Sequence, residues 1–206
     1  MKPIKFELIQ GSRDAESGSQ PDESSLILSA QKGDVSAFKE LYERYRERVY
    51  NLIYYSLENV EQAEDVLQTV FVKVYQALPF FRLESGFLTW IYRVALNECK
   101  NRKRRMKIFL PMTAADASKM KVHPGLSPDA LHEAREMSAV VRDAVKGLKP
   151  KYRNVVVLKY LEEMSYEEIA ETLRCSAGTV ASRLFRALKI LEKELRSYSD
   201  AKGGEK

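Results

Sequence analysis

The chain has 206 residues, of which 45% are hydrophobic and 31% are charged. This is the composition of an ordinary globular protein, and it excludes a collagen-like or wholly disordered chain. No run of about 18 apolar residues occurs, so no membrane-spanning helix is expected, and the polar N-terminus does not have the pattern of a secretory signal. The two cysteines, Cys99 and Cys175, form no CxxC pair, which fits a protein of the reducing cytoplasm.

Positive charge is concentrated in one short segment. The formal net charge of the whole chain is +5, whereas residues 93–107 contain seven basic side chains and one acidic side chain, Glu98. Charge of this density favours a polyanion such as nucleic acid as the partner.

Apolar residues that recur every three or four positions predict helices in the first half of the chain. Residues 1–23 lack this pattern and are expected to form a flexible tail. A short helix is predicted over 24–32, and a longer one follows Asp34, whose carboxylate can accept hydrogen bonds from free first-turn amides. Two further helices are predicted over about 61–78, with Phe71 on the inward side, and from about residue 85 into the basic segment.

Residues 109–130 interrupt the helical pattern with three prolines. A connection of this length is longer than those inside compact domains, so we interpret it as a flexible linker. Beyond it the spacing predicts helices again, and no alternating strand pattern is visible. The predicted fold is therefore all-α, with two small helical domains at 24–108 and 131–197 and a C-terminal tail at 198–206. The helices of the second domain are predicted over about 131–147, 150–162, 165–173 and 177–196.

The last two of these helices are predicted to form a helix-turn-helix. Ser165 and Glu168 have the spacing of a capping box, and the small Ala170 suits the point where two short helices cross. The final helix buries a stripe that begins at Val180. Its opposite face combines hydroxyls, cations and an aromatic ring, which suit the major groove of DNA; the alternative is a solvated helix face. That opposite face consists of Thr179, Ser182, Arg186, Lys189 and Lys193, flanked by Arg183 and Phe185.

Aromatic residues precede the basic segment of the first domain. Aromatic rings beside cations suit single-stranded nucleic acid, because bases stack on rings and phosphates meet cations. Other interpretations stay open: Phe87 has the spacing of a core residue, Trp90 can be partly buried, Phe81 can plug the core, and the cations can be a solvated helix end near the negative dipole terminus. The aromatic residues are Phe80, Phe81, Phe87, Trp90 and Tyr92.

Four sequence blocks, in order and at family-like spacing, resemble bacterial RNA polymerase sigma factors of the extracytoplasmic-function (ECF) group in the sigma-70 family. The resemblance covers about 24–196 and implies a two-domain protein, with sigma domain 2 over 24–108 and sigma domain 4 over 131–197. The blocks are KGD at 32–34 with Ala37 and Phe38, AEDVLQTVF at 63–71, FRLESGFLTWIYRVALNECKN at 81–101, and SYEEIAETLRCSAGTVASRLFRAL at 165–188.

The resemblance implies three sets of contact residues. The clamp helices of the largest subunit of core RNA polymerase would contact Asp65, Gln68, Thr69 and Phe71, and the polymerase flap is a further expected partner. The −10 region of promoter DNA would contact Phe81, Arg82, Leu83, Glu84, Ser85, Trp90, Arg93, Asn97, Lys100, Asn101, Arg102, Lys103 and Arg104, with a flipped base held by the loop 81–85. The −35 region would contact Ser176, Thr179, Ala181, Ser182, Arg183, Phe185 and Arg186.

Two positions depart from the family pattern. Thr69 stands where an acid is usual, and Ala181 stands where many members have Lys or Arg. Asp65 and Gln68 lie three residues apart on one helical face and have no evident local partner. The resemblance further implies that an anti-sigma protein holds the chain inactive and that its promoters serve a stress or envelope response.

Two other classes of protein are alternatives. An operator-binding regulator would use the helix-turn-helix without polymerase, although no dimer interface or sensing pocket is evident. A DNA-acting nuclease would need a metal or nucleophile site, but the two histidines, His123 and His132, lie in or next to the linker and the acids are scattered. We therefore expect neither catalysis nor a bound metal or cofactor. A redox role for the cysteines stays open beside the expectation that both are small core residues.

Overall fold

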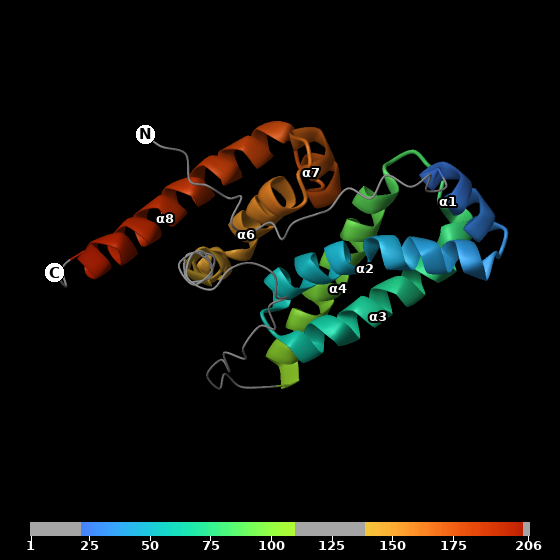
Figure 1. Cartoon of the computed structure of the whole chain (residues 1–206), viewed down its shortest axis with the longest axis horizontal. Coiled ribbons are helices and arrows are strands. Elements are labelled where there is room, and N and C mark those ends of the chain that lie inside the picture. The colour runs from blue at the N-terminus through green and yellow to red at the C-terminus, as the bar shows by residue number, and fades with distance from the viewer. Residues whose placement is uncertain (1–21, 110–138, 204–206) are drawn as a thin grey trace, which may run out of the picture. The chain divides into compact units, whose positions relative to one another are not determined.

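The computed structural model describes residues 22–109 and 139–203, and the side chains of 22–106 and 139–196 (Figure 1). All regular elements in these ranges are helices, and they form two compact units. The all-α prediction with two helical domains is confirmed. Residues 1–21 of the predicted N-terminal tail lie outside the described residues. The predicted linker over 109–130 also lies outside them, except for Phe109, which is the last residue of a helix.

Over residues 22–109 the first unit forms four α-helices and one turn of 3₁₀-helix. The first α-helix stops before Gly33, whose φ of 93° suits a residue without Cβ. Asp34 caps the next helix, because its Oδ1 accepts from the amides of Ser36 at 2.8 Å and Ala37 at 3.2 Å. The elements are α1 (Glu23–Gln31), α2 (Val35–Leu57), α3 (Val60–Ala77), the 3₁₀-helix η2 (Leu78–Phe80) and α4 (Phe87–Phe109).

The core of the first unit lies between α2, α3 and α4, and α1 packs against α2 and η2. In Figure 1, α1 lies beside the turn that joins α3 to α4. The apolar residues that recur at helical spacing are mostly buried, but Val35 is 67% exposed because it is the first residue of α2 and lies beyond the core. The largest fully buried side chains here are Ile27, Leu41, Val49, Leu52, Ile53, Val70, Leu78, Ile91 and Tyr92.

The second unit contains a helix described over 139–147 and a set of elements that follow Pro150. The last helix ends at Gly203 instead of at 196, because no Pro or Gly interrupts the sequence between 196 and Gly203. The predicted tail at 198–206 is therefore helical over most of its length. The elements are α6 (Pro150–Val156), the π-helix η3 (Val157–Leu161), α7 (Tyr166–Leu173) and α8 (Ala177–Gly203).

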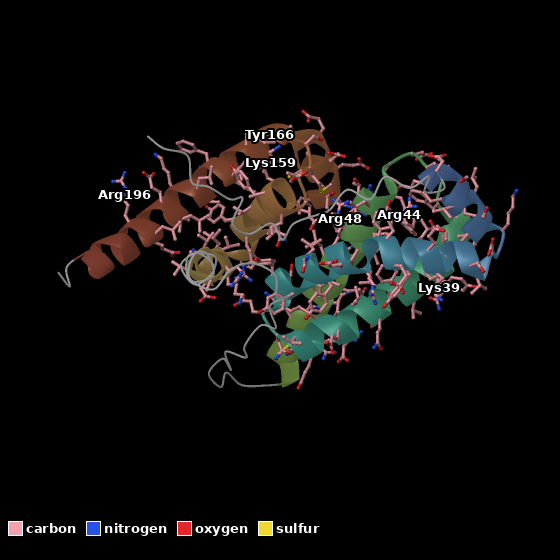
Figure 2. All side chains as sticks on the ribbon, viewed as in Figure 1. Lys39, Arg44, Arg48, Lys159, Tyr166 and Arg196 are labelled. Atoms are coloured by element: carbon pink, nitrogen blue, oxygen red, sulfur yellow. The ribbon has the colours of Figure 1, made fainter. Side chains whose placement is uncertain are left out.

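A buried arginine and a stacked lysine connect the elements of this unit. Arg153 is 5% exposed, and its guanidinium donates to the carbonyl oxygens of Leu148, at 2.9 Å, and Lys146 at the end of the helix over 139–147. A cation is favourable at this negative end of a helix. Lys159 donates to the carbonyl of Met164 at 3.1 Å and lies 5.3 Å from the ring centre of Tyr166 (Figure 2).

The helix-turn-helix forms as predicted. The Ser165 hydroxyl accepts from the Glu168 amide at 3.2 Å, and the Glu168 carboxylate accepts from the Ser165 amide at 2.7 Å, which completes the capping box. Arg174 adopts the left-handed conformation with φ of 51° and ends α7. Ser176 then caps α8, since its hydroxyl accepts from the Thr179 amide at 3.1 Å. These contacts fix the turn between α7 and α8 in a single geometry.

We expect Ser165→Ala to lower the free energy of unfolding of the second unit by about 1 kcal/mol, because the cap of α7 is lost. Ser165→Asn keeps a side-chain acceptor and should leave stability nearly unchanged. Urea denaturation followed by circular dichroism measures both. Equal stability of Ser165→Ala and the unaltered chain would contradict the importance of the capping box.

Candidate nucleic-acid interface

A hollow of about 310 Å³ lies at the turn between α3 and α4. It opens to solvent, and its walls come from the end of α3, from η2, from the following loop and from the first turn of α4. It brings together six of the residues predicted for single-stranded DNA, namely Phe80, Phe81, Arg82, Glu84, Ser85 and Trp90, and adds Ala77.

The rings of Phe81 and Trp90 stack on each other at one wall of this hollow. Their centroids are 4.7 Å apart and their planes differ by 26°. Phe87 meets Phe81 edge-on at 5.6 Å, and Tyr45 meets Phe87 in the same way at 5.6 Å. Phe81 is half-buried, whereas Phe87 is 2% exposed. The core thus supports the Phe81 ring from one side and leaves it accessible from the other.

The loop after Phe81 turns through a backbone conformation that side chains rarely adopt. Leu83 has φ of 56° and a side chain that is 44% exposed. A left-handed conformation at a leucine is uncommon and is often found at functional sites. Arg82 and Glu84, on either side, are exposed. The loop therefore presents its polar side chains to solvent around the stacked rings.

At the basic end of α4, some of the residues predicted to contact the −10 region of DNA are exposed. Asn97, Lys100 and Arg104 are exposed, whereas Arg93, Asn101, Arg102 and Lys103 are half-buried. Tyr92 does not belong to an accessible aromatic surface: it is 0% exposed, because its position on α4 faces the core. The suggestion that it stacks on nucleic acid is therefore wrong.

Among the described side chains, ion pairs connect α4 to α3. The Arg102 guanidinium donates to the Asp65 carboxylate at 3.2 Å, and the Lys73 ammonium donates to Glu98 at 2.6 Å. The expectation that Asp65 lacks a local partner is thus wrong, since the partner lies on the next helix, 37 residues away in the chain. Arg102 is 38% and Asp65 64% exposed, so the pair is solvent-screened and can exchange partners at low cost.

One face of α3 is polar and accessible. Gln68 and Thr69 are exposed, and the Thr69 hydroxyl donates to the Asp65 carbonyl at 2.9 Å. Phe71 does not lie on this face: it is 5% exposed and packs edge-on against Tyr42 at 4.7 Å. It therefore cannot contact a partner directly without unfolding of α3, and its predicted role is revised to support of that helix.

Sequence reasoning missed a residue on the same face. Val72 is 56% exposed although it is apolar, and it follows Gln68 by one helical turn. The helical spacing of Asp65, Gln68 and Val72 is the signal that could have placed it on this face, and large apolar side chains on a surface often mark an interface.

The face of α8 that was predicted to enter a groove is accessible. Ser182, Arg186 and Phe185, which is 60% exposed, lie on the surface, whereas Thr179, Ala181 and Arg183 are half-buried. The Ser176 and Thr179 hydroxyls lie 2.9 Å apart, and Ser182 donates to the Thr179 carbonyl at 3.0 Å. Each hydroxyl has further hydrogen-bonding capacity, so these local bonds leave the face able to contact DNA.

Tyr152 on α6 is a second residue that sequence reasoning missed. A side-chain hydrogen bond from Arg186 is the largest of the effects that lower the pKa of the Tyr152 phenol. The Lys151 ammonium lies 4.9 Å from the centre of the Tyr152 ring. The phenol therefore joins Arg186 to a lysine of a different helix, which no periodicity within α8 could indicate.

Comparisons with known proteins agree with this arrangement. Residues 41–107 match the family model described as Sigma-70 region 2, and residues 138–191 match the one described as Sigma-70, region 4. The ECF RNA polymerase sigma factor SigW of Bacillus subtilis is 34% identical over 177 residues, which cover 82% of this chain and 95% of that protein. The RNA polymerase sigma-H factor of Pseudomonas aeruginosa is 34% identical over 184 residues, which cover 86% and 95%.

The chain belongs to the sigma-70 family and is an ECF sigma factor. Its function is transcription initiation, with DNA binding and without enzymatic activity. A solved structure of the sigma factor RpoE from Bartonella quintana, in complex with the anti-sigma factor NepR, shares the fold with a TM-score of 0.63 and 21% identity over 79% of this chain and 98% of that one. The family assignment replaces both alternatives considered from the sequence, the polymerase-independent regulator and the nuclease.

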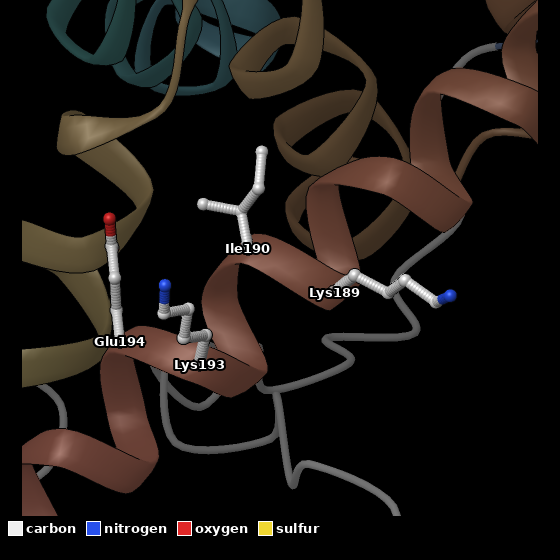
Figure 3. A pocket seen from close by; sticks show the side chains of 4 residues that line it. All are labelled: Lys189, Ile190, Lys193 and Glu194. Carbon is white, nitrogen blue, oxygen red and sulfur yellow. The ribbon is translucent and has the colours of Figure 1, made fainter.

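A second hollow of the sigma factor lies along α8 alone. Figure 3 shows its four lining residues, Lys189, Ile190, Lys193 and Glu194. Its volume is about 570 Å³ and it is open to solvent. Because ligand sites usually enclose most of a small molecule, a groove formed by one helix does not indicate such a site. Within 22–109 and 139–203 no three metal-ligating side chains come together, and no helix has the length and apolar character needed to cross a membrane.

The two cysteines of the sigma factor are free thiols in different surroundings. Cys99 is 3% exposed, and burial raises the pKa of its thiol from 9.0 to about 12. Cys175 is half-buried in the turn before α8, and its sulfur lies 3.9 Å from the Arg183 guanidinium. The thiolate is the reactive form of a cysteine, so the two residues should differ in reactivity.

Iodoacetamide at pH 8 should alkylate Cys175 of the native sigma factor much faster than Cys99, because Cys99 is both shielded and protonated at that pH. Peptide mass spectrometry after timed quenching measures the two rates. In urea the rates should become similar. Fast alkylation of Cys99 in the native chain would contradict its place in the core.

Proposed function

We propose that this ECF sigma factor binds core RNA polymerase and divides promoter recognition between its two units. Residues 24–108 would act as sigma domain 2, at the −10 element, and residues 131–197 as sigma domain 4, at the −35 element. The observation that supports this most is the open hollow with stacked Phe81 and Trp90 beside the cations of α4. Run-off transcription with core polymerase and the purified chain, followed by sequencing of transcript starts, tests the proposal.

Core polymerase would dock on the exposed face of α3. Asp65, Gln68, Thr69 and Val72 offer a charge, an amide, a hydroxyl and an apolar side chain on one surface. Charge-assisted hydrogen bonds of this kind are stronger than neutral ones. On docking, Asp65 would exchange Arg102 for a cation of the polymerase. The free Arg102 would then be available for phosphates of the −10 region.

The hollow at η2 would hold a base that has left the DNA stack. Melting of duplex DNA costs about 1.4 kcal/mol per base step on average. A base that stacks on an aromatic side chain recovers about 1–3 kcal/mol, and the pocket can add hydrogen bonds to the base. Phe81 and Trp90 supply the stacking surface, Arg82, Glu84 and Ser85 the polar groups, and Asn97 and Lys100 the backbone contacts.

α8 would occupy the major groove at the −35 element. Arg186 can donate two hydrogen bonds to guanine and Phe185 can touch a thymine methyl group. Ser182 and Thr179 supply hydroxyls for bases or phosphates, and Arg183 supplies a second cation. Tyr152 would orient Arg186, since Arg186 lies close enough to lower the pKa of the Tyr152 phenol.

An anti-sigma protein would control access to these faces. RpoE from Bartonella quintana was solved with the anti-sigma factor NepR, and we propose a partner of the same class for this chain. The partner would cover the α3 or α8 face until a stress or envelope signal releases it. Because core polymerase and promoter DNA are in the cytoplasm, that compartment is the proposed location.

Replacement of both Asp65 and Gln68 by Ala should weaken binding to core polymerase by roughly 1–3 kcal/mol, the scale of lost charge-assisted hydrogen bonds. Folding should persist, since both side chains are exposed. Fluorescence anisotropy of the labelled chain titrated with core polymerase measures the affinity. The control is Glu47→Ala with Asn51→Ala, which removes an acid and an amide on α2, away from the proposed docking face. Equal affinity of the two double variants would refute the docking surface.

Arg186→Ala should cost about 1–3 kcal/mol in binding to the upstream element and relax base preference there. Helix stability should change by only about tenths of a kcal/mol, because Ala favours the helix. Binding of holoenzyme to a library of upstream sequences measures the preference. Arg196→Ala, which removes the same side chain further along α8, is the control. Full retention of base preference in Arg186→Ala would show that this face does not contact the bases.

Phe81→Ala should slow promoter opening while binding to closed duplex stays nearly normal, because α8 and the cations of α4 are unaltered. Permanganate footprinting with the mutant holoenzyme measures thymine reactivity in the −10 region. Phe38→Ala is the control, since it removes another half-buried ring, packed against Tyr75 at 4.9 Å. Normal thymine reactivity would refute base capture. A loss of about 3–5 kcal/mol in stability would show instead that Phe81 is a core residue.

A further inference from the structure

Gln31, the last residue of α1, reaches the loop that forms the hollow. Its side-chain amide donates to the carbonyl oxygen of Leu78 at 3.1 Å and to that of Phe81 at 2.6 Å. Both acceptors are carbonyls, so the nitrogen of the amide must face them, and its two hydrogens satisfy one acceptor each. The two bonds join residues 47 and 50 positions apart in the chain.

These two bonds span the turn that leads into the loop. The Leu78 carbonyl already accepts from the Phe81 amide at 3.0 Å, which closes the 3₁₀ turn, and Gln31 adds a bond at each end of that turn. With both carbonyls held, the position of the Phe81 backbone is fixed relative to α1. The ring then meets Trp90 at 4.7 Å and Phe87 at 5.6 Å.

α1 itself is firmly attached, so it can serve as a support. Leu26, Ile27 and Ala30 are buried under it. At its start, Glu23 lies near the Tyr45 phenol: burial, followed by the Glu23 charge, raises the pKa of that phenol. Tyr45 in turn packs against Phe87. Both ends of α1 therefore contact residues that lead to the Phe81 ring.

We propose that Gln31 is a positioning residue for base capture: it holds the Phe81 carbonyl so that the ring stays stacked on Trp90 and the hollow stays open before DNA arrives. The inference rests on the proposed function of the hollow. The proposal gives α1 the role of positioning Phe81, although α1 lies before the segment 41–107 that matches Sigma-70 region 2. A site that is formed in advance avoids the ordering cost on binding, so loss of Gln31 should slow promoter opening without weakening duplex contacts.

The single tryptophan of the chain, Trp90, provides a readout that needs no DNA. Gln31→Met keeps the length of the side chain and removes both donors. It should raise the acrylamide quenching constant of Trp90 about twofold, as expected when a loop opens locally, while the far-UV circular dichroism stays unchanged. Gln31→Lys keeps a donor and should restore most of the protection. Gln62→Met is the control, since Gln62 is a half-buried glutamine elsewhere in the same unit.

The second readout is promoter opening by holoenzyme on a promoter mapped from transcript starts. Gln31→Met should slow the appearance of permanganate-reactive thymines about tenfold, the scale of two lost hydrogen bonds, whereas binding to an upstream −35 duplex should not change. Unchanged Trp90 quenching in Gln31→Met would overturn the proposal. So would normal opening in Gln31→Met when Phe81→Ala is slow. Normal opening in both variants would refute base capture by this loop as well, which separates the two failures.

Discussion

The stack of Phe81 on Trp90 is the contact on which the proposed site of the first unit depends. It exists because α4 starts immediately after the loop and places Trp90 one turn into the helix, opposite Phe81, the residue that follows the 3₁₀ turn. The edge-on contacts of Phe87 with Phe81 and of Tyr45 with Phe87 extend the stack into the core. Aromatic pairs of this geometry contribute about 0.5–1.5 kcal/mol beyond area burial, so the rings are ordered without DNA.

The packing of α3 against α4 also forms an ion pair between a residue proposed to bind polymerase and a residue proposed to bind DNA. Asp65 belongs to the face proposed for polymerase, and Arg102 belongs to the segment proposed for DNA, yet the two side chains bind each other. The pair is exposed, so its net contribution to stability is small. In the free chain the pair gives each of the two charged side chains a partner of opposite charge. Docking on polymerase and contact with phosphates would then be linked through a single exchange of partners.

Local signals were sufficient for much of the fold. The acceptor side chains at Asp34, Ser165 and Ser176 cap the helices that they precede, because a cap involves only the next few residues. Phe71 shows where two kinds of inference differ: the helical spacing placed it inward, the family resemblance placed it against polymerase, and its burial agrees with the spacing. The bonds of Asp65, Tyr152 and Gln31 could not be predicted, since each joins different helices and depends on tertiary packing.

The central claim is that the hollow beside Phe81 and Trp90 captures one base of the −10 element. The most direct measurement replaces single bases of the non-template strand by 2-aminopurine and follows fluorescence as holoenzyme opens the promoter. Capture predicts that one position changes differently from its neighbours, because that base stacks on a ring instead of on adjacent bases, and that Phe81→Ala removes this difference. A uniform change along the melted segment, identical in Phe81→Ala, would contradict the account.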